Sequence, residues 1–416
     1  MLLDPMLRRL IKIGDLTVID AEGATHRFQG EGGPKATIRL HDKALEREIL
    51  LRPDPTVGDA YMDGRLTIEE GDLLDFIMIA FENSQRINWN FGGVAGAKSF
   101  LDRLLRRFHS WNSKRAAQNN ISRHYDLSGA LYELFLDEER SYTMAYFPTG
   151  RETIEEAQRN KELHLASKLA LKPGHSVIDL GCGWGTLGLF LARNYDVEVT
   201  GVTLSIEQCR WANDRARALG LEKRARFLHQ DYRDAEGRFD RVVSVGMLEH
   251  VGISDFPTFF SKTRDLLKDD GVAVIHSIGR AAGPGFTSHW IRKHIFPGGY
   301  IPALSEVVPS IERLGLWITD VEILRLHYAE TLRLWRQKFH QNEDKVKALY
   351  DERFVRMWDF YLAGAEGFFR AQDGMNFQIQ MTRERSTLPL TRDYMLDHER
   401  SRLRQNGAPD VRVAAE

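Results

Sequence analysis

The stretch VIDLGCGWGTLGLFLARNYDVEVTGVTLS, residues 177–205, contains three glycines between an apolar run and a potential helix: Gly181, Gly183 and Gly185. Glycines let the backbone approach a ligand closely, and the start of the following helix offers free N–H groups and a positive dipole end. The G-x-G-x-G spacing lacks the third glycine of the dinucleotide fingerprint. A tight turn, a nicotinamide site and an S-adenosylmethionine site all remain open at this point.

Short apolar segments alternate with helical lengths on both sides of this stretch. The strand candidates cover residues 176–181, 197–204, 225–231, 239–247 and 271–279, and residues 317–324 and 376–383 are candidates for a sixth and a seventh strand. This alternation predicts a parallel, doubly wound α/β sheet. Such sheets bind their ligands at the carboxyl ends of the strands, where the remaining motifs also fall.

The ends of the first three strands favour S-adenosylmethionine. Asp179 ends the first strand, where a carboxylate can organise the glycine loop and face a cationic ligand. The second strand ends without an acidic residue for a ribose, and Gln208 is the polar alternative. The third ends in QDYRD, which offers Tyr232 as a flat face for adenine and Asp231 as an acceptor for its amino group.

Two further polar residues follow the next strands. The segment GMLEHVG puts Glu249 at the end of the fourth strand, and VIHSIG puts His276 at the end of the fifth. Because both are carboxyl ends, we expect the two side chains to converge on one site. Taken singly, Glu249 also fits a carboxylate at a helix start and His276 a buried structural histidine. Beside the glycine loop, the pair favours catalysis.

Length and composition bound the class of protein. A chain of 416 residues predicts two domains. The net charge of −2 excludes a global basic field for nucleic acid. The two cysteines, Cys182 and Cys209, cannot form a four-ligand zinc site by themselves, so no metal is predicted and a reducing cytoplasm fits. No apolar stretch reaches the roughly 20 residues of a membrane span.

We expect four regions along the chain. Residues 1–90 form a small α+β domain, with strands within 16–28 and 35–42 and a buried helix over 72–84. Residues 91–120 form a basic amphipathic connecting helix, residues 121–400 carry the doubly wound domain, and residues 401–416 are a frayed tail. The connecting helix suits an anionic bilayer surface, and an interdomain helix is the alternative. Its basic side chains include Arg103, Arg106 and Arg107.

Six motifs occur in an order that one family shares: HYDLS, DLGCGWG, GVTLSIEQ, QDYRD, VSVGMLEHVG and HSIG. The chain resembles the cyclopropane-fatty-acyl-phospholipid synthases, relatives of the mycolic acid cyclopropane synthases, most strongly over residues 120–385. The resemblance implies a seven-stranded, Rossmann-like class I methyltransferase domain. It also implies methylene transfer from S-adenosylmethionine to the cis double bond of phospholipid acyl chains, with Trp184 walling the cofactor pocket. The implied cofactor contacts are Tyr142, Thr143, Gly181, Gly183, Thr203, Gln208 and Tyr232.

The same resemblance implies a bound bicarbonate ion as the base that removes a proton from the new methyl group. Its implied ligands are Glu249, His276, the Ile278 backbone and Tyr328. One position departs from the family, which usually has a cysteine where the segment SYTMAYF has Met144. Methionine is larger than cysteine and has no donor. Either cyclopropanation is retained with Met144 in the catalytic site, or the product is a methylene- or methyl-branched chain.

Two more alternatives stay open, a non-catalytic paralogue that binds S-adenosylmethionine or lipid and a methyltransferase of small soluble molecules. The aromatic stretch over residues 324–370 predicts core packing, with an acyl tunnel as the alternative. The resemblance implies a homodimer. The expected location is the cytoplasmic face of the membrane, as a peripheral protein that binds phospholipids with cis-unsaturated chains and no nucleic acid.

Overall fold

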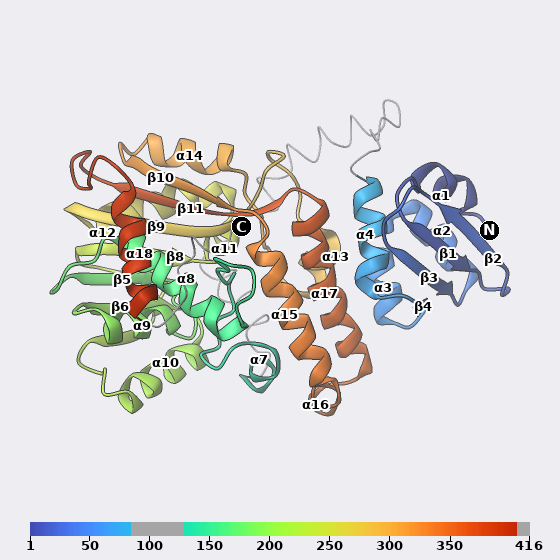
Figure 1. Cartoon of the computed structure of the whole chain (residues 1–416), viewed down its shortest axis with the longest axis horizontal. Coiled ribbons are helices and arrows are strands. Elements are labelled where there is room, and N and C mark those ends of the chain that lie inside the picture. Colours follow the sequence, from blue (N-terminus) through green and yellow to red (C-terminus); the bar gives the residue numbers. More distant parts are fainter. Residues whose placement is uncertain (85–128, 406–416) are drawn as a thin grey trace. The chain divides into compact units, whose positions relative to one another are not determined.

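The computed structural model describes residues 1–84 and 129–405 of the chain, which fall into two compact units (Figure 1). Unit 1 comprises Met1–His109, Phe286–Pro297 and Tyr328–Gly374, and unit 2 comprises Ser110–Gly285, Gly298–His327 and Met375–Glu416. The basic helix expected over residues 91–120, the HYDLS motif and residues 406–416 lie outside the described residues. Residues 401–405 were expected to fray, but they are helical and end helix α18 (Asp393–Gln405).

Two internal segments cluster with the N-terminal residues in unit 1, although we expected both in the larger domain. Helix α17 (Glu352–Ala371) packs against helix α4 (Leu73–Ser84) through small residues. Ala363 belongs to the N-terminal apolar core, and a Cβ on Gly367 would lie 2.8 Å from the side chain of Ile77. Contacts between helices far apart in the sequence therefore divide the chain, and the expected functional boundaries stay a prediction.

Unit 1 contains a small sheet with helices, as the sequence predicts for its N-terminal part. The elements of unit 1 are α1 (Asp4–Leu10), β1 (Asp15–Ile19), β2 (Thr25–Gln29), β3 (Lys35–Leu40), α2 (Lys43–Leu51), α3 (Pro53–Met62), β4 (Leu66–Glu70), α4, α13 (His289–His294), α15 (His327–Gln341), α16 (Glu343–Leu349) and α17. The strand order is β2-β1-β3-β4, and only the β1–β3 pair is parallel. The sequence did not predict β4.

Several aromatic side chains of the 324–370 stretch are buried. Trp335, Phe339 and Trp358 are fully buried, and the rings of Trp358 and Tyr361 meet edge to face with their centroids 5.2 Å apart. Core packing is therefore confirmed for these side chains. The acyl tunnel stays a prediction.

Unit 2 is built on a seven-stranded sheet, as predicted. Its elements are α7 (Gly129–Phe135), α8 (Ile154–Leu169), β5 (Ser176–Leu180), α9 (Thr186–Asn194), β6 (Glu198–Thr203), α10 (Ile206–Ala218), β7 (Ala225–His229), η1 (Tyr232–Asp234), β8 (Phe239–Val245), α11 (Leu248–Val251), η2 (Ile253–Asp255), α12 (Phe256–Leu266), β9 (Leu267–Arg280), α14 (Leu304–Glu312), β10 (Trp317–Leu324), β11 (Gly374–Thr382) and α18. None of the helices in the described residues is long and apolar enough to traverse a bilayer.

The strand order is β10-β11-β9-β8-β5-β6-β7, with the first strand of the unit near the middle. The pairs among β5 to β9 are parallel, whereas β10 and β11 pair antiparallel. The sheet is therefore mixed, and the expectation of a fully parallel sheet is wrong. The apolar pattern of a strand shows its burial but carries no information about its direction.

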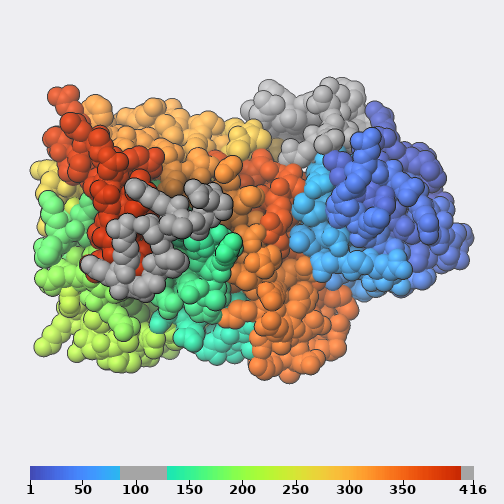
Figure 2. Space-filling model, viewed as in Figure 1, coloured from blue at the N-terminus to red at the C-terminus, as the bar shows by residue number. Residues whose placement is uncertain are grey.

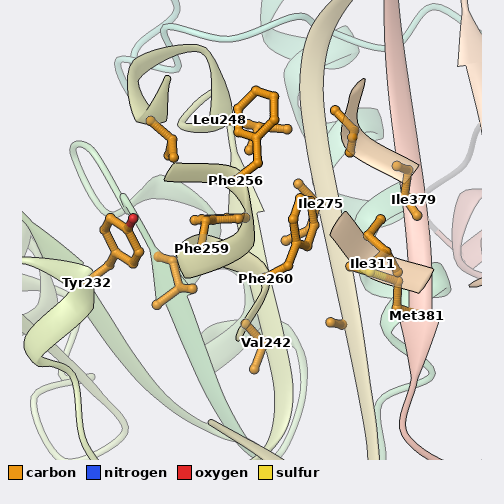
Figure 3. Close-up of a cluster of buried hydrophobic side chains, with 14 of the residues drawn as sticks. Tyr232, Val242, Leu248, Phe256, Phe259, Phe260, Ile275, Ile311, Ile379 and Met381 are labelled. Atoms are coloured by element: carbon orange, nitrogen blue, oxygen red, sulfur yellow. The ribbon is translucent and has the colours of Figure 1, made fainter. Parts of the chain in front are cut away.

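Helices cover both faces of this sheet, and each face has its own apolar core. Successive strand residues alternate between the cores, because neighbouring side chains point to opposite faces. Val274 packs with side chains of α8, α9 and α10, and the next residue, Ile275, packs with those of α11, α12 and α14. Phe259 and Phe260 of α12 point at the strands in this second core (Figure 3). The fold is thus doubly wound, as predicted.

The sheet face beneath α8 also buries polar side chains. On β11 the apolar residues alternate with Asn376, Gln378 and Gln380, a pattern that normally predicts one solvent-facing side. All three amides are nevertheless buried, and Gln380 Nε2 donates to the carbonyl of Lys168 on α8 at 2.5 Å. Helix α18 packs on α8 in turn, at the surface of unit 2 (red in Figure 2). Helix α8 therefore separates a polar layer from solvent.

Candidate active site

The glycine loop joins β5 to α9 and bends through three glycines in the left-handed region. Their φ angles are +80° at Gly181, +54° at Gly183 and +78° at Gly185. A Cβ on Gly185 would lie 2.8 Å from Ala212 and Phe227, so close packing requires glycine there. At Gly183 nothing among the described residues comes within 4 Å of a Cβ position. The loop thus leaves open space at Gly183, as a ligand that touches backbone requires.

Trp184 packs beside the loop in an aromatic group. Its ring centroid lies 6.0 Å from that of Tyr132 on α7 and 5.6 Å from that of Trp211, and the guanidinium of Arg140 lies 4.8 Å away over the ring. Tyr142 packs on the same Tyr132 ring at 5.3 Å. The indole N–H of Trp184 is buried without a hydrogen-bond partner among the described residues. A donor is therefore available beside the loop.

The segment that carries Thr143 and Met144 is fastened to α8. Gln158 Nε2 donates to the carbonyl oxygens of Ser141 at 3.2 Å and Thr143 at 2.9 Å. Lys161 Nζ donates to the Thr143 hydroxyl at 3.2 Å. Met144, at the position of the family's cysteine, is fully buried. Two polar side chains of α8 thus fix the backbone and the hydroxyl of this segment.

Asp179 lies near the end of β5 and is buried, with 2% of its surface exposed. Val177 of the same strand packs with α8, so Asp179, two residues further on, points to the α8 side of the sheet. Burial raises the pKa of Asp179 to about 7, and the charge of Lys161 opposes this rise. A cationic ligand would favour the ionised form, because opposite charges nearby stabilise it.

The next two strand ends hold their predicted residues in protein contacts. Thr203 Oγ1 donates to Gln208 Oε1 at 3.0 Å, and both side chains are buried. The Asp231 carboxylate accepts from Arg233 Nε at 2.9 Å and Nη2 at 2.7 Å, so the expected acceptor for adenine is already paired with a guanidinium. Tyr232 faces the apolar core rather than lying open (Figure 3). The cofactor roles of these four residues stay predictions.

Glu249 lies in α11, directly after β8. Its Oε1 accepts the Ile278 N–H at 2.5 Å, while Oε2 is buried without a hydrogen-bond partner among the described residues. Burial raises the pKa of Glu249 to about 7, and hydrogen bonding from the backbone of Ile278, from its own backbone and from the Ser277 side chain limits the rise. The Ile278 N–H, which the family resemblance implies as a bicarbonate contact, thus donates to Glu249, and its role toward bicarbonate stays a prediction.

His276 lies on β9 and is also buried. Its ring nitrogens meet the amide side chains of β11, with Nε2 3.3 Å from Asn376 Nδ2 and Nδ1 3.1 Å from Gln378 Nε2. Burial, with the charge of Lys161 as the next cause, lowers the pKa of His276 to about 3. The ring is thus neutral at physiological pH. Glu249 and His276 are held by separate partners, and no hydrogen bond joins them within residues 129–405.

Tyr328, the remaining expected ligand of bicarbonate, belongs to unit 1. It is the second residue of α15 and is buried. Its ring centroid lies 4.9 Å from that of Phe369 and 5.9 Å from that of Trp335. A role for Tyr328 in the site of unit 2 stays a prediction.

The residues at the loop fit S-adenosylmethionine. The space at Gly183 admits a ligand against backbone, the orphaned indole N–H of Trp184 offers a donor, and the buried carboxyl of Asp179 suits a cation. No group of three His, Cys, Asp or Glu side chains that could hold a metal ion occurs in the described part of the chain.

Bicarbonate fits the chain in part. Glu249 Oε2 lacks a donor, which the hydroxyl of bicarbonate would supply. The other two expected contacts in unit 2, the Ile278 N–H and the His276 ring, already have protein partners. Only the carboxylate therefore presents an open hydrogen-bonding position.

A doubly wound sheet of seven strands, with a glycine loop after its first strand and a buried carboxyl at that strand's end, defines the class of S-adenosylmethionine-dependent methyltransferases. The family described as "Mycolic acid cyclopropane synthetase" matches residues 112–379, and the chain belongs to that family. The resemblance seen in the sequence is thereby confirmed.

Three known proteins illustrate the relationship. The chain is 37% identical over 351 residues to the "Probable fatty acid methyltransferase" of Pseudomonas putida, covering 82% of this chain and 85% of the relative. It is 34% identical over 355 residues to the "Cyclopropane-fatty-acyl-phospholipid synthase" of Escherichia coli (strain K12), covering 85% and 89%. The structure of mycolic acid cyclopropane synthase CmaA1 complexed with SAH and CTAB matches with a TM-score of 0.60 at 32% identity, covering 64% of this chain and 97% of that chain.

Several polar residues at this site were not predicted from the sequence. Lys161 and Gln158 belong to helix α8, in which polar and apolar side chains are buried together, so no separate apolar stripe distinguishes one face. Asn376 and Gln378 follow the alternation of a strand exposed on one side. Arg233 follows Asp231 by two residues in the sequence. This short spacing is the only feature of the sequence that could have suggested their ion pair.

Proposed function

We propose that the protein is a cyclopropane-fatty-acyl-phospholipid synthase. The alkene of a cis-unsaturated acyl chain attacks the methyl carbon of S-adenosylmethionine, a proton leaves the new methyl group, and the ring closes. S-adenosylhomocysteine, a proton and the cyclopropane chain are the products. Membership of the family and the lipid-related names of the relatives support this assignment.

The observation that carries the proposal is the state of the Glu249 side chain. One carboxylate oxygen is fixed by the Ile278 N–H, and the other is buried without a donor at the end of a central strand. A buried acceptor without a partner is costly, so the free oxygen calls for a donor that binds beside it. Here the free oxygen can receive the hydrogen of a bound acid or base at a site shielded from water.

The chain's own residues have three tasks in this reaction. Asp179 attracts the cationic methyl donor, and the glycine loop lets that donor lie against backbone. The buried side chains of Met144 and Ala145 keep the site apolar, which matters because water would quench a carbocation on the acyl chain. Glu249 orients the proton acceptor through its free oxygen.

Bicarbonate, when bound, supplies the base that takes the proton. Glu249, His276 and Tyr328 are the residues that would hold the ion, Glu249 by accepting a hydrogen bond and the other two by donating one. To do so, the His276 ring must exchange one of its amide contacts on β11 for the anion. We place the reaction at the cytoplasmic face of the membrane, where the protein acts as a peripheral homodimer.

The test is to incubate the purified protein with S-adenosylmethionine, bicarbonate and vesicles of anionic phospholipid with cis-monounsaturated chains, and to examine the lipids by proton NMR. Upfield cyclopropane protons are the expected result, with a lower rate in bicarbonate-free buffer. The matched variants are Glu249→Gln, expected to lose activity, and Glu312→Gln, an exposed carboxyl of α14 expected to keep it. Absence of any new lipid signal would contradict the proposal and favour a non-catalytic paralogue or a soluble substrate.

A second function, methylene or methyl branching of the same chains, is favoured by one residue. Met144 replaces the cysteine expected near bicarbonate, is fully buried, and offers no donor. A relative named as a probable fatty acid methyltransferase agrees with this alternative. Olefinic methylene or branched methyl signals in the same NMR assay would establish it. Met144→Cys should then shift the product toward the ring.

A further inference from the structure

Lys161 is a buried cation within the candidate active site that the reaction described above does not use. Only 3% of its surface is exposed, and its ammonium donates to the neutral hydroxyl of Thr143 at 3.2 Å. Among the described residues it has no carboxylate in direct ion-pair contact. A buried charge costs free energy unless hydrogen bonds and nearby opposite charges compensate for it. The surroundings of Lys161 must therefore supply negative charge at longer range.

Three buried carboxyl groups interact electrostatically with Lys161. They are Asp179 on β5, Asp137 after α7 and Glu162, the next residue on α8. Burial raises the pKa of each carboxyl, and in each the positive charge of Lys161 acts against the rise. On β9 the same charge helps to lower the pKa of His276, after the larger effect of burial. Lys161 therefore acts electrostatically on β5, β9, α8 and the residues after α7.

Lys161 and the three carboxyl groups can together carry a net charge of −1, which a bound cation would neutralise. Burial raises the pKa of Glu162 to about 8, so this side chain is mostly neutral at pH 7. Asp137 accepts hydrogen bonds from the N–H and hydroxyl of Ser141 and from the Glu139 N–H, which favour its ionised form. With Asp179 ionised, the group has one more carboxylate than ammonium. S-adenosylmethionine carries a net positive charge at this pH and would balance it.

We propose that Lys161 is a positioning residue for S-adenosylmethionine, which acts through Thr143 and through the charge of Asp179. The proposal rests on the proposed function for the identity of the ligand and of the loop residues. Lys161 donates to the hydroxyl of Thr143, and Gln158 donates to its carbonyl oxygen. These two hydrogen bonds fix the position of the segment around Thr143. Lys161 also keeps the Asp179 carboxylate available for a cation at neutral pH.

The test measures binding of S-adenosylmethionine to the full chain by titration calorimetry between pH 6.5 and pH 9, without lipid. Lys161→Met should lower the affinity at pH 7 at least about tenfold, equivalent to about 1.4 kcal/mol. The loss should shrink toward pH 9, because Asp179 then ionises without help from a neighbouring cation. For S-adenosylhomocysteine, whose sulfur is uncharged, the same substitution should reduce the affinity less.

Lys168→Met is the matched control. Lys168 lies two turns further along α8 and is equally buried, but its ammonium pairs with Glu322 of β10 at 2.5 Å. Its loss should lower the thermal stability while leaving the affinity for S-adenosylmethionine and its pH dependence within about threefold of the unsubstituted chain. An equal affinity loss in both variants would mean that any buried charge on α8 has the same effect, and would overturn the proposal.

A second pair of variants isolates the hydrogen bond and avoids removing a charge. Thr143→Val should weaken binding about threefold to tenfold, and Thr143→Ser, which keeps the hydroxyl, should bind nearly normally. Unchanged affinity in both Lys161→Met and Thr143→Val would overturn this inference alone. If the unsubstituted chain did not bind S-adenosylmethionine, the proposed function would fail together with it.

Discussion

Glu249 and His276 share one physical cause for opposite pKa shifts. Burial disfavours the charged form of each group, so it raises the pKa of the carboxyl to about 7 and lowers the pKa of the imidazole to about 3. At neutral pH the histidine is uncharged and the glutamate is close to its titration midpoint. A carboxyl at its midpoint near the working pH suits proton handling.

For Glu249, we expect a rise of kcat/KM with pH, with a midpoint near 7. The ionised carboxylate is the form that can accept a hydrogen from bicarbonate, and burial delays its ionisation to that pH. Glu249→Gln should lower kcat at least about 100-fold and abolish this midpoint. Steady-state assays of lipid methylation from pH 6 to pH 9 would measure both. A midpoint that persists in the variant would assign the titration to another group.

For His276, we expect an effect on stability in acid. The unfolded histidine takes up a proton near pH 6.5, but the folded one does so only near pH 3, so its contribution to stability is lost as pH falls through this window. Glu249 acts in the opposite direction between its unfolded value of 4.5 and about 7, since there the folded state holds more protons. The effect of His276 is therefore measured as the difference in free energy of unfolding between a His276 variant and the unsubstituted chain.

His276→Gln should be less stable at pH 8, because the contacts to Asn376 and Gln378 change. Below pH 6.5 the gap should narrow by up to about 1.4 kcal/mol per pH unit. Urea unfolding at pH 8, 6 and 5 would measure the gap. A gap independent of pH would show that the folded protein protonates His276 as readily as the unfolded chain does.

At the scale of elements, the junction between the glycine loop and α9 depends on the absence of one side chain. Gly185 has a φ of +78° and faces Ala212 of α10 and Phe227 of β7, each 2.8 Å from a Cβ position. Alanine there would meet both backbone strain and a clash with a buried ring. We therefore expect Gly185→Ala to destabilise the protein by about 2–4 kcal/mol.

Gly220→Ala is the control for this prediction. Gly220 has a similar φ of +67°, but nothing among the described residues lies within 4 Å of its Cβ position. The substitution should cost about 1 kcal/mol, from backbone strain alone. Thermal unfolding of both variants would separate the two effects. Equal losses would contradict the view that α9, α10 and β7 are packed against the bare Gly185.

Attachment of the whole protein to a membrane should depend on the basic segment over residues 91–120, which lies outside the described residues. Its arginines predict attraction to anionic lipid, at about 1 kcal/mol for each basic residue near the surface. Reversing three of them should lower partitioning onto anionic vesicles at least about tenfold at low salt, with little effect on affinity for S-adenosylmethionine. Vesicle sedimentation measures the partitioning. The three substitutions are Arg103→Glu, Arg106→Glu and Arg107→Glu.

A second triple variant keeps the same net charge change but places it elsewhere. It combines Arg47→Glu, Arg193→Glu and Arg313→Glu, all at exposed positions. Its partitioning should fall less than that of the first variant, and added salt should reduce the difference because screening shortens the range of charges. An equal loss of partitioning in the two triple variants would show that binding to vesicles depends on the net charge of the protein and not on the basic segment.

Local patterns in the sequence were enough to predict the doubly wound fold, all seven strands of its sheet and the glycine loop, because these depend on apolar runs and on residues with special backbone freedom. It also pointed to Glu249 and His276 at strand ends. Contacts between distant parts of the chain determine that β10 and β11 pair antiparallel, that the residues of α17 join the N-terminal unit, and that the charge of the buried Lys161 acts on Asp179. Strand direction, long-range helix packing and the burial of polar side chains depend on partners far away in the chain, and no local pattern identifies those partners.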